Sequence, residues 1–385
     1  MAASPAGQLV PIQGMDSRFG LYACFAFFPA PLPEDVSLSM ATISEVARAS
    51  SSLARLDQAC AQLVGPDVLI RPALYREALD TSALEGTYGQ LTEVLEAELP
   101  GAHFRSSETR EIRGYMDAAL NSFESVEKMP ISVGLLSDAQ ATMFHSADSP
   151  PKDLGKVREH QVWIGPPDES ILEARFVPLP GDDRLRSSLE ACVSWIEADN
   201  DWPPVLRAAL AHYHFETLHP FGDGNGRIGR LLIVLQLLRA GVIQHPAVTV
   251  SPWLLKNRDE YQDQLLHVSC SGDWNPWVQF FCRGITYQCD AVIAGAVKLH
   301  AWLTDARDRI NERRWAGAIY DVLHDLTQWP VTSIAAISKR HDMTATAASN
   351  IVNHLVELEI LEEMTGRSYG RVFGATGVMQ IVDDI

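Results

Sequence analysis

One short stretch concentrates the residue types that could do chemistry. Residues 218–232, LHPFGDGNGRIGRLL, place a histidine, a carboxylate, several glycines and two arginines between apolar segments. Histidine is the usual general base near neutral pH, and guanidinium groups are natural partners for phosphate oxygens. The stretch therefore predicts a site that binds an anion and moves a proton.

The glycine corner is expected to cradle a phosphate at a helix N-terminus. Apolar residues at helical spacing predict a helix over 228–238. Backbone N–H groups at the start of a helix, together with its dipole, favour an anion. We therefore expect the N–H groups of Gly224, Asn225 and Gly226 to face the ligand.

Charged residues around this corner complete the expected site. Arg227 and Arg230 are three positions apart, so both can reach the same end of the helix. Asp223 offers a hard oxygen ligand, which beside phosphates indicates magnesium. His219, one turn earlier, is the expected general base.

Other sites with a similar composition fit less well. No Gly-Lys-Ser/Thr follows the glycines, as a Walker A loop requires, and the preceding segment is helical, unlike a dinucleotide fingerprint. An EF-hand loop fails at Arg227 and Val234, where calcium ligands belong. Zinc bound by His212, His214 and His219 is disfavoured, because the first two point in different directions on a helix.

The stretch from His219 to Arg230 resembles the full motif of the Fic (filamentation induced by cAMP) family, H-P-F-x-[D/E]-G-N-G-R-x-x-R. The resemblance implies a protein adenylyltransferase, which moves AMP from ATP to a Ser, Thr or Tyr hydroxyl of a target protein and releases pyrophosphate. It implies that His219 deprotonates the hydroxyl and that Asp223 holds the magnesium. The implied nucleotide-binding residues are Gly224, Asn225 and Gly226 in the anion hole, Arg227 on the phosphates and Arg230 on the γ-phosphate.

Two further segments resemble parts of the same family. Two short apolar runs flank a Pro-Pro-Asp turn in residues 160–180, which predicts a hairpin. It resembles the family's flap, whose edge accepts a target peptide as an added strand. The flap residues implied to bind the target are Val162, Trp163, Ile164 and Gly165.

The stretch REALDTSALEGTYG, residues 76–89, resembles the family's inhibitory motif at Thr81, Glu85 and Gly86. On local grounds alone, Glu85 reads as a surface residue beside a helix-stopping glycine, where a carboxylate opposes the helix dipole. The resemblance implies instead that Glu85 pairs with Arg230. ATP would then bind in an unproductive pose.

The overall pattern predicts a mainly α protein. We expect an extended arm over 1–37, helices between 39 and 148, the flap, and further helices from 183 to 300. The expected units are 1–107 (arm and helical region with the inhibitory motif), 108–304 (helical Fic core) and 305–385.

The last unit reads as a winged helix-turn-helix. Residues 332–364 predict helix, turn, helix, and 365–375 a turn between two short strands; many bacterial relatives carry such a module. It holds eight Lys or Arg against twelve Asp or Glu, and its expected recognition helix, 344–358, has neither Lys nor Arg. Phosphate contacts dominate DNA affinity, so DNA is an unlikely partner and protein contact is favoured.

The composition argues against several classes of protein, namely nucleic-acid-binding, membrane-binding and disulfide-rich proteins. A net charge of −18 argues against general affinity for nucleic acid or anionic membranes. The six cysteines show no CxxC spacing, which indicates free thiols rather than disulfides or a zinc ribbon. With no targeting or membrane segment evident, a cytoplasmic location is the expectation.

Two functional hypotheses follow. The first is a self-inhibited AMP transferase that uses ATP and Mg²⁺ on an unidentified target protein, with the chain itself included. The second is a nucleotide-responsive winged-helix regulatory protein with little catalysis. Removal of AMP as the main activity and a homodimer both stay open.

Overall fold

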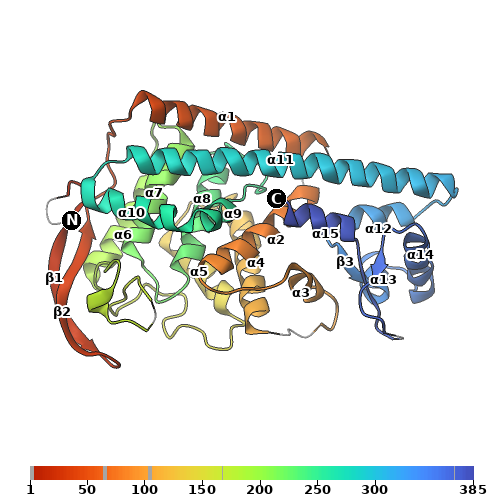
Figure 1. Ribbon diagram of the computed structural model, residues 1–385, viewed down its shortest axis with the longest axis horizontal. Coiled ribbons are helices and arrows are strands. Elements are labelled where there is room, and N and C mark those ends of the chain that lie inside the picture. Colours follow the sequence, from red (N-terminus) through yellow and green to blue (C-terminus); the bar gives the residue numbers. More distant parts are fainter. Residues whose placement is uncertain (1–3, 64–66, 103–105, 167, 368) are drawn as a thin grey trace.

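The computed structural model describes the chain except for residues 1–3, 64–66, 103–105, 167 and 368. The described part is mostly helical, and it is elongated, with a β-hairpin at one end and a small mixed module at the other (Figure 1). The helices are α1 Met40–Leu63, α2 Asp67–Leu84, α3 Leu91–Glu96, α4 Ser107–Val126, α5 Val133–Phe144, α6 Asp183–Glu197, α7 Pro204–Leu218, α8 Asn225–Arg239, α9 Ser251–Lys256, α10 Arg258–Ser271, α11 Asn275–Glu312, α12 Ile319–Asp325, α13 Ile334–Arg340, α14 Ala345–Glu357 and α15 Thr376–Asp383. The strands are β1 Gly7–Asp16, β2 Gly20–Pro29, β3 Val331–Ser333, β4 Glu362–Glu363 and β5 Val372–Gly374.

The N-terminal segment is a hairpin, so the expectation of an extended arm was wrong. β1 and β2 pair antiparallel along their whole length, from Gly7 opposite Pro29 to Asp16 opposite Gly20. The turn is closed by the Asp16 carboxylate, which accepts from the N–H groups of Arg18 and Phe19. Its proline, glycine and alanine content masked two runs of strand-forming residues around this Asx turn.

Two long helices form the spine of the molecule. α1 packs along α11, as Figure 1 shows, and α11 alone has 38 residues, or about 57 Å at 1.5 Å per residue. The expected boundary between 304 and 305 lies within α11. This helix therefore connects the central helices to the C-terminal module without a break.

Capping residues set where the central helices begin. Ser106 accepts from the N–H of Thr109 at the start of α4, and Ser132 does the same for Leu135 at α5. Pro204 occupies the first turn of α7, where a missing N–H costs nothing. The helices expected over 183–198 and 203–217 correspond to α6 and α7.

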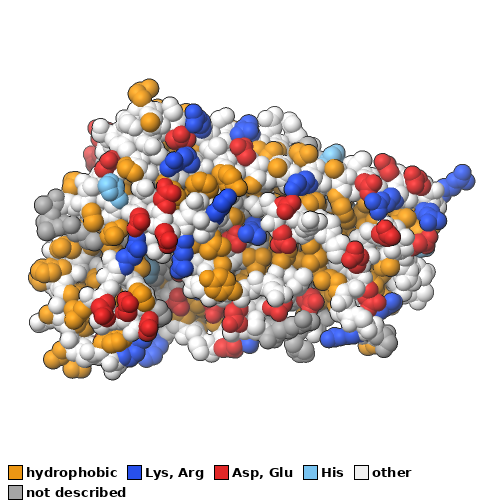
Figure 2. Space-filling model, in the orientation of Figure 1, with side chains coloured by type: hydrophobic (Ala, Val, Ile, Leu, Met, Phe, Trp, Pro, Cys, Tyr) orange, Lys and Arg blue, Asp and Glu red, His pale blue; other side chains and the backbone are white. Residues whose placement is uncertain are grey.

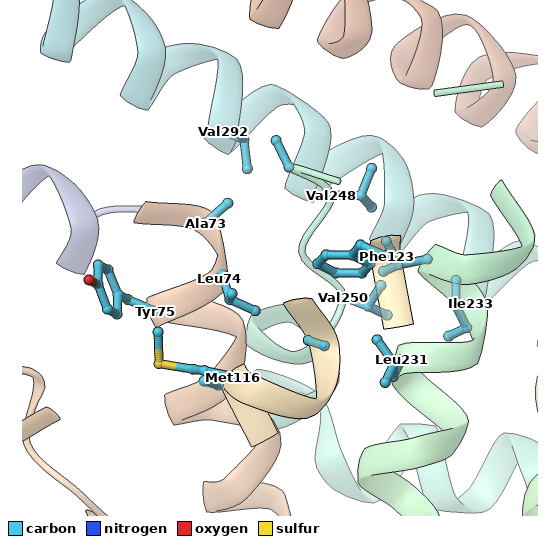
Figure 3. Close-up of a cluster of buried hydrophobic side chains, with 14 of the residues drawn as sticks. Ala73, Leu74, Tyr75, Met116, Phe123, Leu231, Ile233, Val248, Val250 and Val292 are labelled. Atoms are coloured by element: carbon cyan, nitrogen blue, oxygen red, sulfur yellow. The ribbon is translucent and has the colours of Figure 1, made fainter. Parts of the chain in front are cut away.

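The core fixes α2 against the helix that follows the glycine corner. Figure 3 shows side chains of α2, α4 and α8 converging, with the 248–250 segment and α11 behind them. The labelled cluster includes Leu74 on α2, Met116 on α4 and Leu231 on α8, and all three are buried. Residues about 150 positions apart in the sequence are thereby held in one apolar cluster.

The predicted flap is a minimal hairpin. Ile164 and Phe176 exchange two backbone hydrogen bonds of 2.8 and 3.1 Å, and a short 3₁₀ helix, Ile171–Glu173, lies between them. Of the expected turn, residue 167 lies outside the described part. The N–H of Phe27 donates to the carbonyl of Val177 at 2.8 Å, so the base of the N-terminal hairpin extends the flap.

The C-terminal module has the element order expected of a winged helix-turn-helix. α12, β3, α13 and α14 are followed by β4 and β5, and the sheet order is β3-β5-β4. Ser333 and Thr344 cap α13 and α14 through their side chains. On the face shown in Figure 2, acidic and basic side chains are interspersed at this end of the molecule, without a broad basic patch.

We expect Leu74→Ala to lower the free energy of unfolding by about 2–5 kcal/mol, because it leaves a cavity in the cluster that holds α2. Urea titration followed by circular dichroism measures the change. Leu172→Ala is the matched control, since Leu172 is exposed and its truncation is expected to cost less than about 0.5 kcal/mol. Equal effects of the two substitutions would contradict this view of the core.

Candidate functional site

His219 ends α7 in a conformation that few residues other than glycine adopt. It is the C-cap of the helix with φ of 49° and ψ of 60°, a left-handed conformation that costs about 1–3 kcal/mol and needs support from its surroundings. The ring's Nδ1 is buried and hydrogen-bonds to none of the described residues. Burial, reinforced by the positive charge of Arg158, lowers the pKa of His219 to about 4. The imidazole is therefore neutral near pH 7, as a proton acceptor must be.

The glycine corner folds as the start of α8. Gly224 is its N-cap with φ of +82°, and a Cβ there would collide with Met143 and Phe144. The side chain of Asn225 both donates to and accepts from the backbone of Phe221 at 2.8 Å. Asn225 therefore holds the loop shape with its side chain, while its N–H belongs to the helix terminus.

Arg230 lies under this helix terminus and is engaged by Thr81 and Glu85. Its side chain is 2% exposed; Nη2 lies 2.7 Å from Glu85 Oε1, and Nε donates to Thr81 Oγ1 at 2.7 Å. Nη2 also donates to the Thr81 carbonyl at 3.1 Å. Although burial alone would lower it, the Glu85 carboxylate keeps the pKa of Arg230 above its ordinary value.

The Glu85 carboxylate also lies against the N-terminus of α8. It follows the last residue of α2, and Gly86, with φ of +88°, turns the chain away. A Cβ on Gly226 would collide with Glu85 Oε1, so the carboxylate rests directly on the first turn of α8. Burial raises the pKa of Glu85, but Arg230, Arg227 and His219 together hold it below its usual range. An anion is thus already present where the motif is expected to bind one.

Arg227 is turned toward a second carboxylate. Its guanidinium lies 3.1 Å from Glu111 on α4 and 3.9 Å from Asp223, and it stacks 4.8 Å from the ring centre of Phe144. The Asp223 side chain is 63% exposed, and its Oδ1 accepts from the N–H of Gly224 at 2.6 Å. Partial loss of solvation beside neighbouring protein atoms raises the pKa of Asp223, although Arg227 acts to lower it.

The structure therefore brings most of the expected site residues together. Arg230 contacts both Thr81 and Glu85, and Glu85 also rests on Gly226. Asp223, just before α8, lies 3.9 Å from Arg227 on its first turn. The flap residues Val162, Trp163 and Ile164 are half-buried and Gly165 is exposed. They meet the site through Arg158, which hydrogen-bonds to both His160 and His219.

Sequence reasoning missed two charged residues at this site. Glu111 and Arg158 lie outside the motif, and an isolated Glu or Arg on a helix or before a hairpin carries no sequence signal of burial. Arg158 is 1% exposed. Its one hint is its place in the segment GKVREHQVWIG that leads into the flap.

The histidines of α7 offer no metal site. Within the part of the chain that the structure describes, three or more His, Cys, Asp or Glu side chains never cluster in a way that would hold a metal ion. His212 instead shares hydrogen bonds with the Gly229 carbonyl and the Tyr261 hydroxyl, at 3.0 and 2.8 Å. The zinc alternative is therefore not supported by these residues.

Two family models and several curated proteins match this chain in sequence. The family model for the Fic/DOC family N-terminal region matches residues 43–124, and the Fic/DOC family model matches residues 130–237. Protein adenylyltransferase fic-1 of Caenorhabditis briggsae is 32% identical over 226 residues, which is 56% of this chain and 40% of that protein. Protein adenylyltransferase Fic of Drosophila ananassae is 30% identical over 217 residues, 54% of this chain and 40% of that protein.

A solved structure shares the fold. The crystal structure of a Fic family protein from Desulfovibrio desulfuricans G20 matches with a TM-score of 0.56 and 20% identity, covering 90% of this chain and 98% of that one. The chain belongs to the Fic/DOC family. Its match spans 40% of the length of the curated relatives named above. Among the described residues, moreover, none of the helices combines the length and apolarity needed to cross a membrane.

We expect the free energy of unfolding to fall as the pH drops from about 6.5 toward 4. Burial lowers the pKa of His212 to about 3 and those of His214 and His219 to about 4, so the unfolded chain binds more protons in this window. The buried carboxyls of Glu216 and Asp80, with pKa values raised to about 8 and about 6, act in the opposite direction. Burial also raises the pKa of Glu77, which acts in the same direction as these two carboxyls. We expect the three histidines to outweigh them.

Urea titrations at pH 7 and pH 5 measure this difference. His214→Leu is the informative variant, because it removes one buried imidazole and is expected to make the pH dependence shallower. The same pH dependence in His214→Leu as in the unaltered chain would show that this histidine is not held neutral by the fold.

Proposed function

We propose that this chain is a protein adenylyltransferase whose own inhibitory helix holds it inactive. The observation that carries the proposal is the place of the Glu85 carboxylate, on Arg230 and against Gly226 at the N-terminus of α8. A helix N-terminus with a buried guanidinium is an anion site, and a carboxylate stands in for a phosphate there. The adenylyltransferase names of the relatives support an ATP phosphate as the natural occupant.

Inhibition follows from this competition. With Glu85 in place, the γ-phosphate of ATP loses its cation and meets a second negative charge. The nucleotide then adopts a pose in which its α-phosphorus is not aligned for attack. Displacement of the α2 end would free Arg230 and let the triphosphate lie along the first turn of α8.

The residues present fit a magnesium ion held jointly with the phosphates. Magnesium is commonly bound by one or two carboxylates plus substrate phosphates, and Asp223 offers a largely exposed carboxylate beside Arg227. When bound there, the ion would neutralise charge on the phosphates. Asp223 is the residue we assign to hold it.

His219 is proposed to accept the proton of the attacking hydroxyl. Its low pKa keeps the ring neutral, and the charge of a bound triphosphate would raise that pKa toward the working pH. The target oxygen then bonds to the α-phosphorus while pyrophosphate leaves. Arg227 and Arg230 hold the departing phosphates, and the free edge of the flap at Trp163 and Gly165 accepts the target segment as an added strand.

The partners and setting of the protein are part of the same proposal. The target is an unidentified protein, with the chain itself included, and the reaction takes place in the cytoplasm. The winged helix-turn-helix is assigned to protein contact, since its acidic balance is unsuited to DNA.

We expect Glu85→Gly to increase AMP transfer at least tenfold over the unaltered chain, because Arg230 becomes available to the γ-phosphate. Incorporation of label from α-³²P-ATP with Mg²⁺, into the chain itself and into a cell lysate, measures transfer. Glu127→Gly is the matched control, since Glu127 also follows a helix but is exposed and far from Arg230 in sequence and contacts. Equal labelling by Glu85→Gly and the unaltered chain over a range of ATP and Mg²⁺ would refute the inhibitory role.

We expect His219→Ala, introduced into Glu85→Gly, to reduce transfer to background while leaving Mg²⁺–ATP binding intact. Calorimetry measures binding, and mass spectrometry for an AMP adduct measures transfer. Nucleotide binding without any adduct in both variants would instead support a nucleotide-responsive regulatory protein. Full transfer by the His219→Ala double variant would exclude His219 as the base.

A further inference from the structure

A single guanidinium joins the base histidine to the flap. Arg158 Nε donates to the His219 carbonyl at 2.7 Å, and Nη2 donates to the Leu218 carbonyl at 3.2 Å. On its other side, Nη1 donates to the His160 carbonyl at 2.7 Å and Nη2 to the Leu179 carbonyl at 2.6 Å. These last two carbonyls are the two ends of the flap.

The electrostatic reason for this arrangement is the end of α7. The last carbonyl groups of a helix lack partners within it and carry its negative dipole end, which a cation stabilises. Arg158 supplies that cation, and it lies within ion-pair distance of none of the carboxylates among the described residues. Burial lowers the pKa of Arg158 to about 10, a value at which it stays charged near neutrality.

The backbone of Arg158 also links the flap to the segment around His219. The N–H of Arg158 donates to the Pro220 carbonyl at 2.9 Å, so Arg158 contacts three successive residues, 218 to 220. His219 holds its left-handed backbone in the middle of that set. The direction in which its ring leaves the chain is therefore fixed by the same residue that closes the flap.

We propose that Arg158 is a positioning residue, which sets the distance between the flap-bound target segment and the ring of His219. This inference rests on the proposed AMP transfer. A target strand added at the free edge beside Trp163 and Gly165 presents its hydroxyl at a place fixed by the flap, and the ring must meet it there. Because Arg158 contacts neither nucleotide-binding arginine, its role is in the transfer step rather than in ATP affinity.

The chain contains a matched control for this residue. Arg207 donates through Nη2 to three carbonyl groups at the C-terminal end of α6, those of Trp195, Ile196 and Ala198, at 2.7–2.8 Å. Like Arg158, it therefore donates to several backbone carbonyls, but none of them belongs to the flap or to residues 218–220. Loss of stability alone should affect both arginines in a similar way.

The experiment compares Arg158→Lys and Arg158→Gln with Arg207→Lys and Arg207→Gln, all in the full chain carrying Glu85→Gly. Calorimetry gives Mg²⁺–ATP affinity, urea titration gives stability, and label from α-³²P-ATP gives the transfer rate. NMR of ring-labelled histidine, assigned with His219→Ala, gives the titration of His219. Two charged groups act on this ring, namely Arg158 before the flap and Glu85 after α2. The backbone of Glu216 on α7 also acts on the ring and raises its pKa.

We expect Arg158→Gln to reduce transfer about 100-fold, the effect of misplacing a reacting group by about 1 Å, while ATP affinity stays within about twofold. Arg158→Lys should recover part of that loss, since it restores the charge but not the fork of donors. The pKa of His219 should rise in Arg158→Gln, because a neighbouring cation is lost, and the acidic limb of the rate profile should move to higher pH. The Arg207 variants should leave both rate and titration unchanged.

Two results would overturn the inference. One is an unchanged transfer rate and His219 titration in the Arg158 variants, and the other is the same shift in the Arg207 variants. Failure of the proposed function is a separate result, namely Glu85→Gly that binds Mg²⁺–ATP without transferring AMP. In that case the titration of His219 in the Arg158 variants is the one measurement that decides whether Arg158 positions the His219 ring.

Discussion

The contact between Glu85 and Arg230 is the interaction on which the arrangement of the site depends. It joins the end of α2 to the first turn of α8 through a buried guanidinium and a carboxylate that rests on Gly226. A buried guanidinium without a partner is costly, so some anion must meet Arg230. The fold supplies that anion from its own chain, and a nucleotide phosphate would have to replace it.

The position of Glu85 depends on how α2 packs in the core. α2 is held by apolar side chains that it shares with α4 and α8, as seen around Leu74, Met116 and Leu231 (Figure 3). Thr81 on its last turn and Glu85 just after it contact Arg230, so the apolar cluster also holds the residues that meet the guanidinium.

The sequence predicted which residues meet at the glycine corner better than it predicted the residues that support them. His219, Gly226 and Arg230 follow from a compact motif, because a base, a helix terminus and guanidiniums at fixed spacing have few other uses. Arg158 and Glu111 could not be found this way, since their roles come from burial and from contacts with segments distant in sequence. The N-terminal hairpin was missed because Pro, Gly and Ala masked its strands, whereas most helices were predicted from apolar spacing.

The most direct measurement is a crystal structure of the Glu85→Gly chain with Mg²⁺ and a non-hydrolysable ATP analogue. The account predicts the γ-phosphate within hydrogen-bond distance of Arg230, in the place that the Glu85 carboxylate now fills, with the α-phosphorus facing His219. Phosphates bound elsewhere, with Arg230 turned to another protein carboxylate, would contradict it.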